Sequence, residues 1–237
     1  MRTTLELGLD ALGLDKSCIP TLEEFTALML ERNQVMNLTA ITEPKDVASL
    51  HLLDSLALIQ VSGLEAETVV DVGAGAGFPG MPLAIARPGL HVTLLDSLGK
   101  RVDFLREACK TLHLNNTECI HARAEEFAGE RRETFDVSVS RAVAAMPVLC
   151  ELCLPLVKVG GRMLAMKSSH TEEEIDHAKA AIKILGGQIE WVRDYTIPTT
   201  DVVHRAVCIR KISPTPKKYP RRFAVIKKSP LGVPGQK

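Results

Sequence analysis

The sequence predicts an α/β protein with a Rossmann-like sheet that is covered by helices on both faces. From Thr68 onward, strand-like apolar runs alternate with helix-like stretches, which is typical of a parallel sheet. A loop with four glycines, Gly73 to Gly80, follows the first run. The last two runs have no helix between them, and strands joined in this way are usually antiparallel neighbours. Five β–α units followed by an antiparallel pair therefore predict a sheet of seven strands.

Residues 1–66 are predicted to form a helical extension that packs on the sheet domain. Apolar residues recur there near helical spacing, as at Leu22, Phe25 and Met29, and the spacing continues in the second half of the segment. The short length of this segment favours an extension over a separate fold.

The sheet domain is predicted to span residues 67–212. Its strands are expected at 68–72, 91–96, 118–121, 135–139, 162–166, 188–195 and 202–209. Its helices are expected at 81–86, 100–112, 146–156 and 171–185. Residues 213–237 are rich in proline and lysine, and we expect them to form an irregular, flexible and basic C-terminal tail.

The composition excludes several classes of protein. A hydrophobic fraction of 46% is that of a folded globular chain, and no apolar run approaches the ~20 residues that span a bilayer. The first residues carry no secretion signal, and six irregularly spaced cysteines indicate a reduced protein, so we expect a cytoplasmic location and no membrane partner. Cys150 and Cys153 lack a second ligand pair, so no metal site is expected.

The net charge of zero hides an asymmetry along the chain. Ten Lys or Arg residues and a single acid lie between Asp201 and Lys237, so the rest of the chain is acidic. A basic end on an acidic body indicates a polyanionic partner, and nucleic acid is the usual one. A solvated segment that only aids solubility is the alternative, and charge alone leaves it open.

The glycine loop fits two cofactor patterns. Gly75, Gly77 and Gly80 match the dinucleotide pattern G-x-G-x-x-G, and Asp96 lies about 20 residues downstream, where an acid binds ribose. This frame predicts an NAD(P)-dependent dehydrogenase.

The other frame begins with Asp71 and continues through Gly73, Gly75 and Gly77. It resembles the first motif of S-adenosylmethionine-dependent methyltransferases, in which the strand-end acid and the glycines face the methionine part. A carboxylate at Asp96 suits a ribose diol in both frames, because it can accept two hydroxyl hydrogen bonds. Asp71 and the antiparallel final strands favour adenosylmethionine.

Two catalytic motifs are missing from the chain, and their absence limits which atom of a base it can methylate. The loop after the fourth strand, Ser140 to Pro147, has neither a cysteine nucleophile for a pyrimidine carbon nor an Asn/Asp-Pro-Pro motif for an exocyclic amine. An acceptor with its own lone pair, such as N7 of guanine, needs only positioning. We therefore expect no general base, and no catalytic residue is assigned.

Five ordered segments make the pattern specific. They are Asn37–Ile41, His51–Leu56, Asp71–Gly80, Leu95–Arg101 and Ser140–Ala142. Together they resemble the bacterial 16S ribosomal RNA guanine-N7 methyltransferase family, also called glucose-inhibited division protein B. The resemblance implies a class I fold, adenosylmethionine as donor, and one guanine of 16S rRNA (guanine 527 in the family) as acceptor. The small ribosomal subunit or its precursor is the implied partner, and a monomer is expected. A non-catalytic RNA-binding assembly factor remains the third hypothesis.

The same resemblance implies a set of site residues. The cofactor contacts would be Gly73, Gly75, Gly77 and Phe78 in the loop, Asp96, Ser97 and Leu98 beside the ribose and adenine, Ala124 and Glu125 at the adenine edge, and Arg141 at the methionine end. The candidate RNA contacts are Asn37, His51, Lys167, Lys217, Lys218, Tyr219, Arg221 and Arg222, with the basic groups on phosphates and the tyrosine stacked on a base. For His51 a polar network that ties the extension to the core is the alternative, and for Arg141 it is a surface ion pair.

Overall fold

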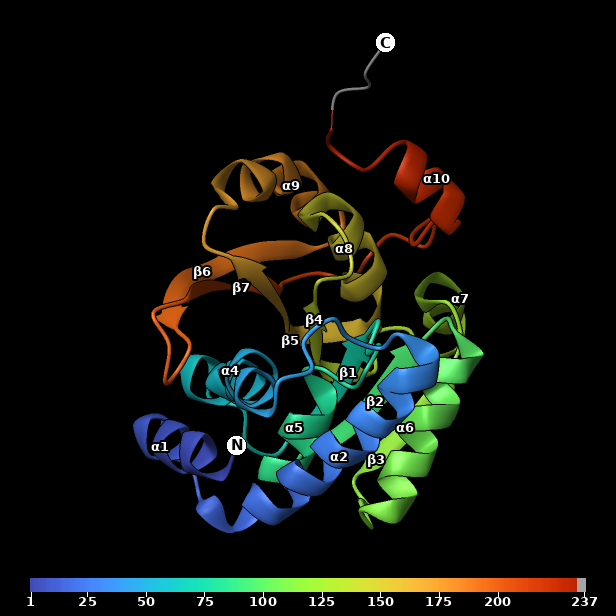
Figure 1. Ribbon diagram of the computed structural model, residues 1–237. Coiled ribbons are helices and arrows are strands. Elements are labelled where there is room, and N and C mark those ends of the chain that lie inside the picture. Colours follow the sequence, from blue (N-terminus) through green and yellow to red (C-terminus); the bar gives the residue numbers. More distant parts are fainter. Residues whose placement is uncertain (234–237) are drawn as a thin grey trace.

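The structure, a computed structural model, describes residues 1–233 (Figure 1). One mixed sheet runs through it in the order β3-β2-β1-β4-β5-β7-β6. The strands are β1 (Thr68–Val72), β2 (His91–Asp96), β3 (Thr117–His121), β4 (Phe135–Arg141), β5 (Val157–Ser168), β6 (Gly187–Thr196) and β7 (Val203–Lys211). The first five strands are parallel, and β7 lies antiparallel between β5 and β6. The predicted seven-stranded α/β fold is confirmed.

Helices cover both faces of this sheet. They are α1 (Arg2–Leu12), α2 (Ile19–Met36), α3 (Pro44–Val47), α4 (Asp54–Ser62), α5 (Gly80–Ala86), α6 (Gly99–Thr111), α7 (Ala124–Glu130), α8 (Met146–Cys153), α9 (Glu172–Ile184) and α10 (Phe223–Lys228). Short turns are η1 (Lys16–Cys18), the wider π-type η2 (Ala48–Leu53) and η3 (Leu154–Leu156). In Figure 1, α1, α2, α4 and α5 lie below the sheet, and α8, α9 and α10 lie above it.

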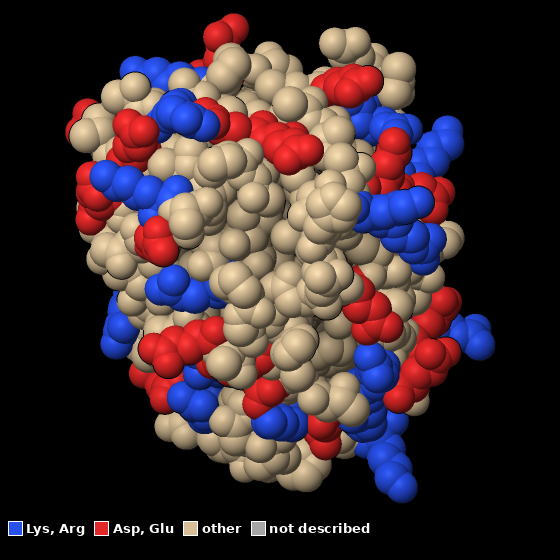
Figure 2. Space-filling view, turned by 90° about the horizontal axis from the view of Figure 1, so that it is seen from below, with Lys and Arg blue, Asp and Glu red and all other residues tan. Residues whose placement is uncertain are grey.

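The two faces of the sheet follow the alternation of side chains along each strand. In β1, Val69 belongs to the apolar core under α1, α2, α4, α5 and α6, whereas Val70 belongs to the core under α7, α8 and α9. The N-terminal helices therefore bury their apolar side chains against the sheet and extend its core. On the face seen from below, charged side chains of both signs surround an uncharged centre (Figure 2). This face therefore shows no continuous basic surface of the kind that binds a polyanion.

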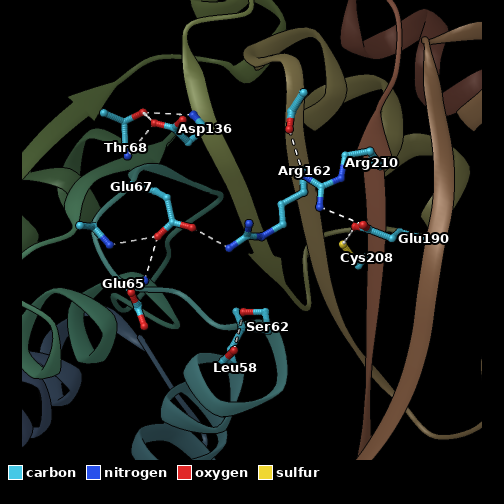
Figure 3. Close-up of polar contacts among 12 residues, drawn as sticks. Leu58, Ser62, Glu65, Glu67, Thr68, Asp136, Arg162, Glu190, Cys208 and Arg210 are labelled. Atoms are coloured by element: carbon cyan, nitrogen blue, oxygen red, sulfur yellow. Dashed lines mark hydrogen bonds and ion pairs between the residues drawn. The ribbon is translucent and has the colours of Figure 1, made fainter.

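Ion pairs and hydrogen bonds join the strands at the edge of the sheet where β1 and β4 begin (Figure 3). Arg162 Nη2 lies 2.6 Å from Glu67 Oε1, and Thr68 donates to Asp136. Arg210 pairs with Glu190 at 2.9 Å. These contacts link β5 to the residue before β1, β1 to β4, and β7 to β6, and the glycine loop follows the other, carboxyl end of β1.

The expectation of an irregular tail is wrong for residues 223–228, which form α10. Ile226 of this helix is buried in the core that contains α8 and α9. Upstream, Arg132 donates to the backbone oxygens of Thr215 and Tyr219, so the segment is held against the domain. The prediction followed the charge and proline content of this segment, which give no weight to the single apolar residue that the basic helix buries. The last part of the predicted tail, residues 234–237, lies outside the described residues.

Candidate cofactor and acceptor site

The glycine loop turns back over the end of β2. Gly73 has a φ of +76°, and a Cβ at this position would lie 2.6 Å from Val143 Cγ2. The N–H groups of Gly73 and Ala74 both donate to the oxygen of Leu95, at 2.8 and 3.0 Å. A side chain at residue 73 would therefore collide with Val143, and the positive φ also favours glycine at this turn.

Asp96 is fixed at the carboxyl end of β2 by two backbone donors. Its Oδ2 accepts from the N–H of Gly75 at 2.9 Å, and its Oδ1 accepts from the N–H of Leu98 at 2.8 Å. Arg101 Nη1 lies 3.7 Å from Oδ2. Each carboxylate oxygen keeps a second lone pair, so the oriented carboxylate can still accept the hydroxyls of a ribose.

The structure corrects the expected orientation of Asp71, which does not face the ligand space. Its side chain is fully buried, and its Oδ2 accepts from the N–H of Gly80 at 2.8 Å. Oδ1 has no hydrogen-bond partner among the described residues, and burial raises the pKa of Asp71 to about 7. Asp71 therefore holds the start of α5 under the loop.

Two adjoining cavities lie over the loop. One has a volume of about 370 Å³ and the other about 220 Å³. Their sizes suit the parts of a cofactor-sized ligand. The larger cavity is lined by Gly73, Gly75, Phe78, Asp96, Ser97, Leu98 and Arg141, among others. The smaller one shares Gly73, Asp96 and Ser97 and adds Ala124 and Glu125. Of the ten predicted cofactor residues, only Gly77 lines neither cavity, because it packs against Met81.

Glu125, at the start of α7, is held by the C-terminal segment. Its Oε1 accepts from Arg123 Nε at 2.8 Å and from the N–H of Phe223 at 3.2 Å. Phe223 also lines the smaller cavity, and the guanidinium of Arg123 lies 5.1 Å from the centre of its ring. The segment after β7 thus closes one side of this cavity, which the sequence did not indicate.

Arg141 ends β4 and is bound to the N-terminal extension. Its Nη1 donates to the oxygen of Leu50 at 3.1 Å and to Asp54 Oδ2 at 2.9 Å. The Arg141 side chain is 15% exposed and Asp54 is fully buried, so this pair is interior, and the surface ion pair considered from the sequence is not what forms. The guanidinium also lies 5.0 Å from the ring centre of Phe78.

Asp54 is the centre of a polar cluster whose partners on β6 and β7 the sequence did not indicate. Besides Arg141, it accepts hydrogen bonds on Oδ1 from Tyr195 Oη at 2.8 Å and from His204 Nδ1 at 2.9 Å. Burial raises the pKa of Asp54, but the hydrogen bond from His204 and the charge of Arg141 outweigh it, so the pKa lies below its usual value. One buried carboxylate thus orients groups from β4, β6 and β7.

His51 lies in the wide turn η2 and stacks on Phe78, with ring centres 4.6 Å apart. Arg141 Nη2 donates to Nδ1 at 3.1 Å, so the ring proton lies on Nε2, which donates to Thr39 Oγ1 at 2.8 Å. Burial, together with the charge of Arg141, lowers the pKa of His51 to about 4. The imidazole is therefore neutral at pH 7. It belongs to a polar network that ties the extension to the core, which the sequence analysis gave as the alternative to RNA contact.

The remaining candidate RNA residues lie on different elements of the structure. Lys167 Nζ donates to the oxygen of Ala144 at 2.7 Å and to Glu174 at 2.5 Å, near the end of β5. Asn37 is exposed and directly follows α2. Lys217, Lys218 and Arg222 lie in the segment before α10, where the two lysines are exposed and Arg222 is half-buried.

Two residues of the tail are engaged with the domain. Tyr219 is only 8% exposed, which contradicts its expected role of stacking on a base. Arg221 forms an ion pair with the fully buried Glu151, at 2.6 Å. Sequence alone could not separate these two from their neighbours, because all of them lie in one short basic run.

Two features are absent from the part of the chain that the structure describes. Within residues 1–233, no group of three or more His, Cys, Asp or Glu side chains is arranged to hold a metal ion. None of the helices in this range has the length and apolar character needed to cross a membrane.

Comparison with known proteins gives a consistent result. Residues 18–203 match a family model described as GidB, rRNA small subunit methyltransferase G. A relative from Alkaliphilus oremlandii named ribosomal RNA small subunit methyltransferase G is 44% identical over 236 residues, which cover 98% of this chain and 99% of the relative. A relative of the same name from Thermoanaerobacter sp. strain X514 is 48% identical over 212 residues, 88% of each chain.

Solved structures are similar at lower identity. M. jannaschii TYW2 in complex with AdoMet has a TM-score of 0.52 at 21% identity, covering 62% of this chain and 70% of that chain. A point mutant of MtNAS has a TM-score of 0.56 at 14% identity, covering 89% of this chain and 86% of that chain. At these identities the likeness shows the fold alone.

Proposed function

The chain belongs to the GidB family of small-subunit rRNA methyltransferases, and from this premise we propose its acceptor, N7 of a single guanine in 16S rRNA. The fold is that of class I methyltransferases, and the enzyme methylates rRNA with S-adenosylmethionine as donor. The proposal includes the small ribosomal subunit or its precursor as partner and a cytoplasmic monomer as the working form. It also keeps the division into an extension (1–66), a catalytic domain (67–212) and a tail (213–237).

The residues around the glycine loop fit this donor. Gly73 lines both cavities and has no side chain, so a ligand in either one can lie close to its backbone. The carboxylate of Asp96 is already oriented by two N–H groups and can accept a ribose diol. Ala124 and Glu125 line the smaller cavity, where the adenine would lie. These contacts leave the larger cavity, toward Phe78 and Arg141, for the methionine end.

The donor, when bound, supplies an electrophilic methyl group on a positively charged sulfur. The residues of the chain bind the donor and orient it toward the acceptor. Asp96 would fix the ribose, and the stacked pair of Phe78 and His51 would bound the methionine end. Such positioning can hold the methyl carbon in line with an attacking nitrogen, which is the main contribution that this reaction needs.

One observation carries the choice of acceptor atom. Apart from arginines, the larger cavity has two titratable residues, His51 and Asp96. Both nitrogens of His51 are hydrogen-bonded, and its pKa of about 4 makes it a poor proton acceptor. Asp96 is assigned to the ribose in this proposal. The N7 atom of guanine has a free lone pair and loses no proton on methylation, so it needs no proton acceptor from this cavity, and His204, which bounds the adjoining cavity, then has a binding role only. The G-x-G-x-x-G match is then a coincidence of spacing.

Methyl transfer to defined acceptors tests this proposal. The enzyme is incubated with methyl-labelled adenosylmethionine and with free 16S rRNA, precursor particles or mature small subunits. We expect label at one guanine, where N7 methylation makes the chain cleavable by borohydride and aniline. Label on an exocyclic amine, a ribose or another base would contradict the proposal.

A further inference from the structure

A third cavity, of about 360 Å³, lies beside the methionine end of the site. Leu50, His51 and Asp54 bound it on the side of the extension, and Met166, Lys167, Ser168 and His204 bound it at the end of β5 and the start of β7. It shares His51, Arg141 and Ala142 with the 370 Å³ cavity. A group held in one of the two cavities therefore faces the other across Arg141.

The three cavities follow one another in a fixed order. The smallest is next to Glu125, the largest reaches from Asp96 to Arg141, and the third lies beyond Arg141. If the adenine and ribose take the first positions, as the proposed function requires, the transferable methyl group points toward the third. The present inference rests on that function and concerns what occupies the third cavity.

His204 presents a directed hydrogen-bonding atom at this cavity. Its Nδ1 lies 2.9 Å from Oδ1 of the buried Asp54, so in the neutral ring the proton is on Nδ1 and the lone pair is on Nε2. Nε2 has no hydrogen-bond partner in the described part of the chain, and the side chain is 29% exposed. Tyr195, which also donates to Asp54, lies edge-on to the imidazole at 6.3 Å. The ring is thus held in one orientation from two sides.

We propose that this cavity receives the acceptor guanine and that His204 Nε2 accepts a hydrogen bond from its N1–H and N2–H₂ edge. Adenine also has an N7 lone pair, but at the matching ring position it presents an acceptor and no N2 amine. A lone pair at Nε2 therefore favours guanine over adenine. The base must leave its helical stack to enter, as is usual when an enzyme acts on a base. His204 is then a specificity-determining contact, and Asp54 is the residue that positions it.

The test measures base preference as well as rate. Small subunits are reconstituted with 16S rRNA that carries guanine or adenine at the methylated position, and the rate of methyl transfer to each is compared. We expect His204→Ala to lower kcat/KM for guanine by about 10-fold to 100-fold and to reduce the preference for guanine over adenine by at least about 10-fold, the loss expected when one base-specific hydrogen bond is removed. His204→Gln, whose amide oxygen can accept a hydrogen bond, should keep part of the preference. His177→Ala, on the exposed side of α9, is the matched control and should leave both rates unchanged.

The affinity for adenosylmethionine, measured by calorimetry, should be unchanged in all these variants, which also shows that they fold. Equal losses for guanine and adenine in His204→Ala, or an unchanged preference, would overturn the inference and leave the proposed function intact. A wild-type enzyme that does not methylate the guanine at all would overturn both.

Discussion

Replacing Asp54 by asparagine should lower the free energy of unfolding by about 3 kcal/mol, the lower end of the ~3–5 kcal/mol that breaking a buried ion pair costs. The buried carboxylate accepts hydrogen bonds from Arg141, Tyr195 and His204. A hydrogen bond to a charged group contributes about 1.5–3 kcal/mol. The asparagine oxygen can still accept from some of these donors, but its NH₂ group faces one of them. The loss is therefore smaller than the sum of the three contacts.

Urea unfolding followed by circular dichroism measures this loss. Asp46→Asn, at an exposed position of α3, is the control and should change stability by less than about 0.5 kcal/mol. The pKa of Asp54 lies below its usual value, so its contribution is present above the unfolded pKa of about 4 and disappears as the pH falls through the folded pKa. The two proteins should thus converge in acid. A loss below about 1 kcal/mol at pH 7, less than one hydrogen bond to a charged group, would refute the central role of Asp54.

Four further predictions concern the loop and the tail. Asp96→Ala should weaken adenosylmethionine binding by about 10-fold to 100-fold in calorimetry, because it removes a hydrogen bond to a charged group worth ~1.5–3 kcal/mol; an unchanged affinity would place the ribose elsewhere. Gly73→Ala should weaken cofactor binding while the fold persists by circular dichroism, since its Cβ would displace Val143, which lines both cavities, and would strain a loop residue with a φ of +76°; normal binding would show that the loop and Val143 do not shape the site. Asp71 has a pKa raised by burial to about 7, so wild-type stability should fall as the pH rises from about 4 to about 7 and then level off, whereas Asp71→Asn should show a flatter profile; equal profiles would argue against the raised pKa. Charge reversal at Lys217 and Lys218, both exposed, should reduce the salt dependence of RNA binding, and an unchanged slope would exclude phosphate contacts there.

The fold could be predicted because its signals are local. The central strands β1, β2 and β4 are short and mostly buried runs, and the missing helix before β7 shows in the sequence as two strands in succession. The cofactor residues cluster for a similar reason. The Gly73 loop follows β1 and Asp96 ends β2, and the carboxyl ends of neighbouring parallel strands meet at one edge of a sheet.

The cluster around Asp54 could not be predicted in this way. Its partners Tyr195 and His204 are 141 and 150 positions away in the sequence, and no spacing pattern links them. The turn η2 adds to the difficulty, because its wide backbone sets where His51 points and carries no simple sequence signal. For Asp71 the sequence indicated an acid that belongs to the glycine-loop motif, but it did not indicate where the side chain points. A strand-end acid can face the ligand or support the loop from below.

The direction in which the donor lies across the cavities can be read from a crystal structure with bound S-adenosylhomocysteine. We expect the ribose hydroxyls on Asp96, the adenine beside Ala124 and Glu125, and the sulfur directed past Arg141 toward the cavity that His204 bounds. Density for the ligand in the opposite direction, with the adenine near Arg141 or the sulfur turned away from His204, would contradict it.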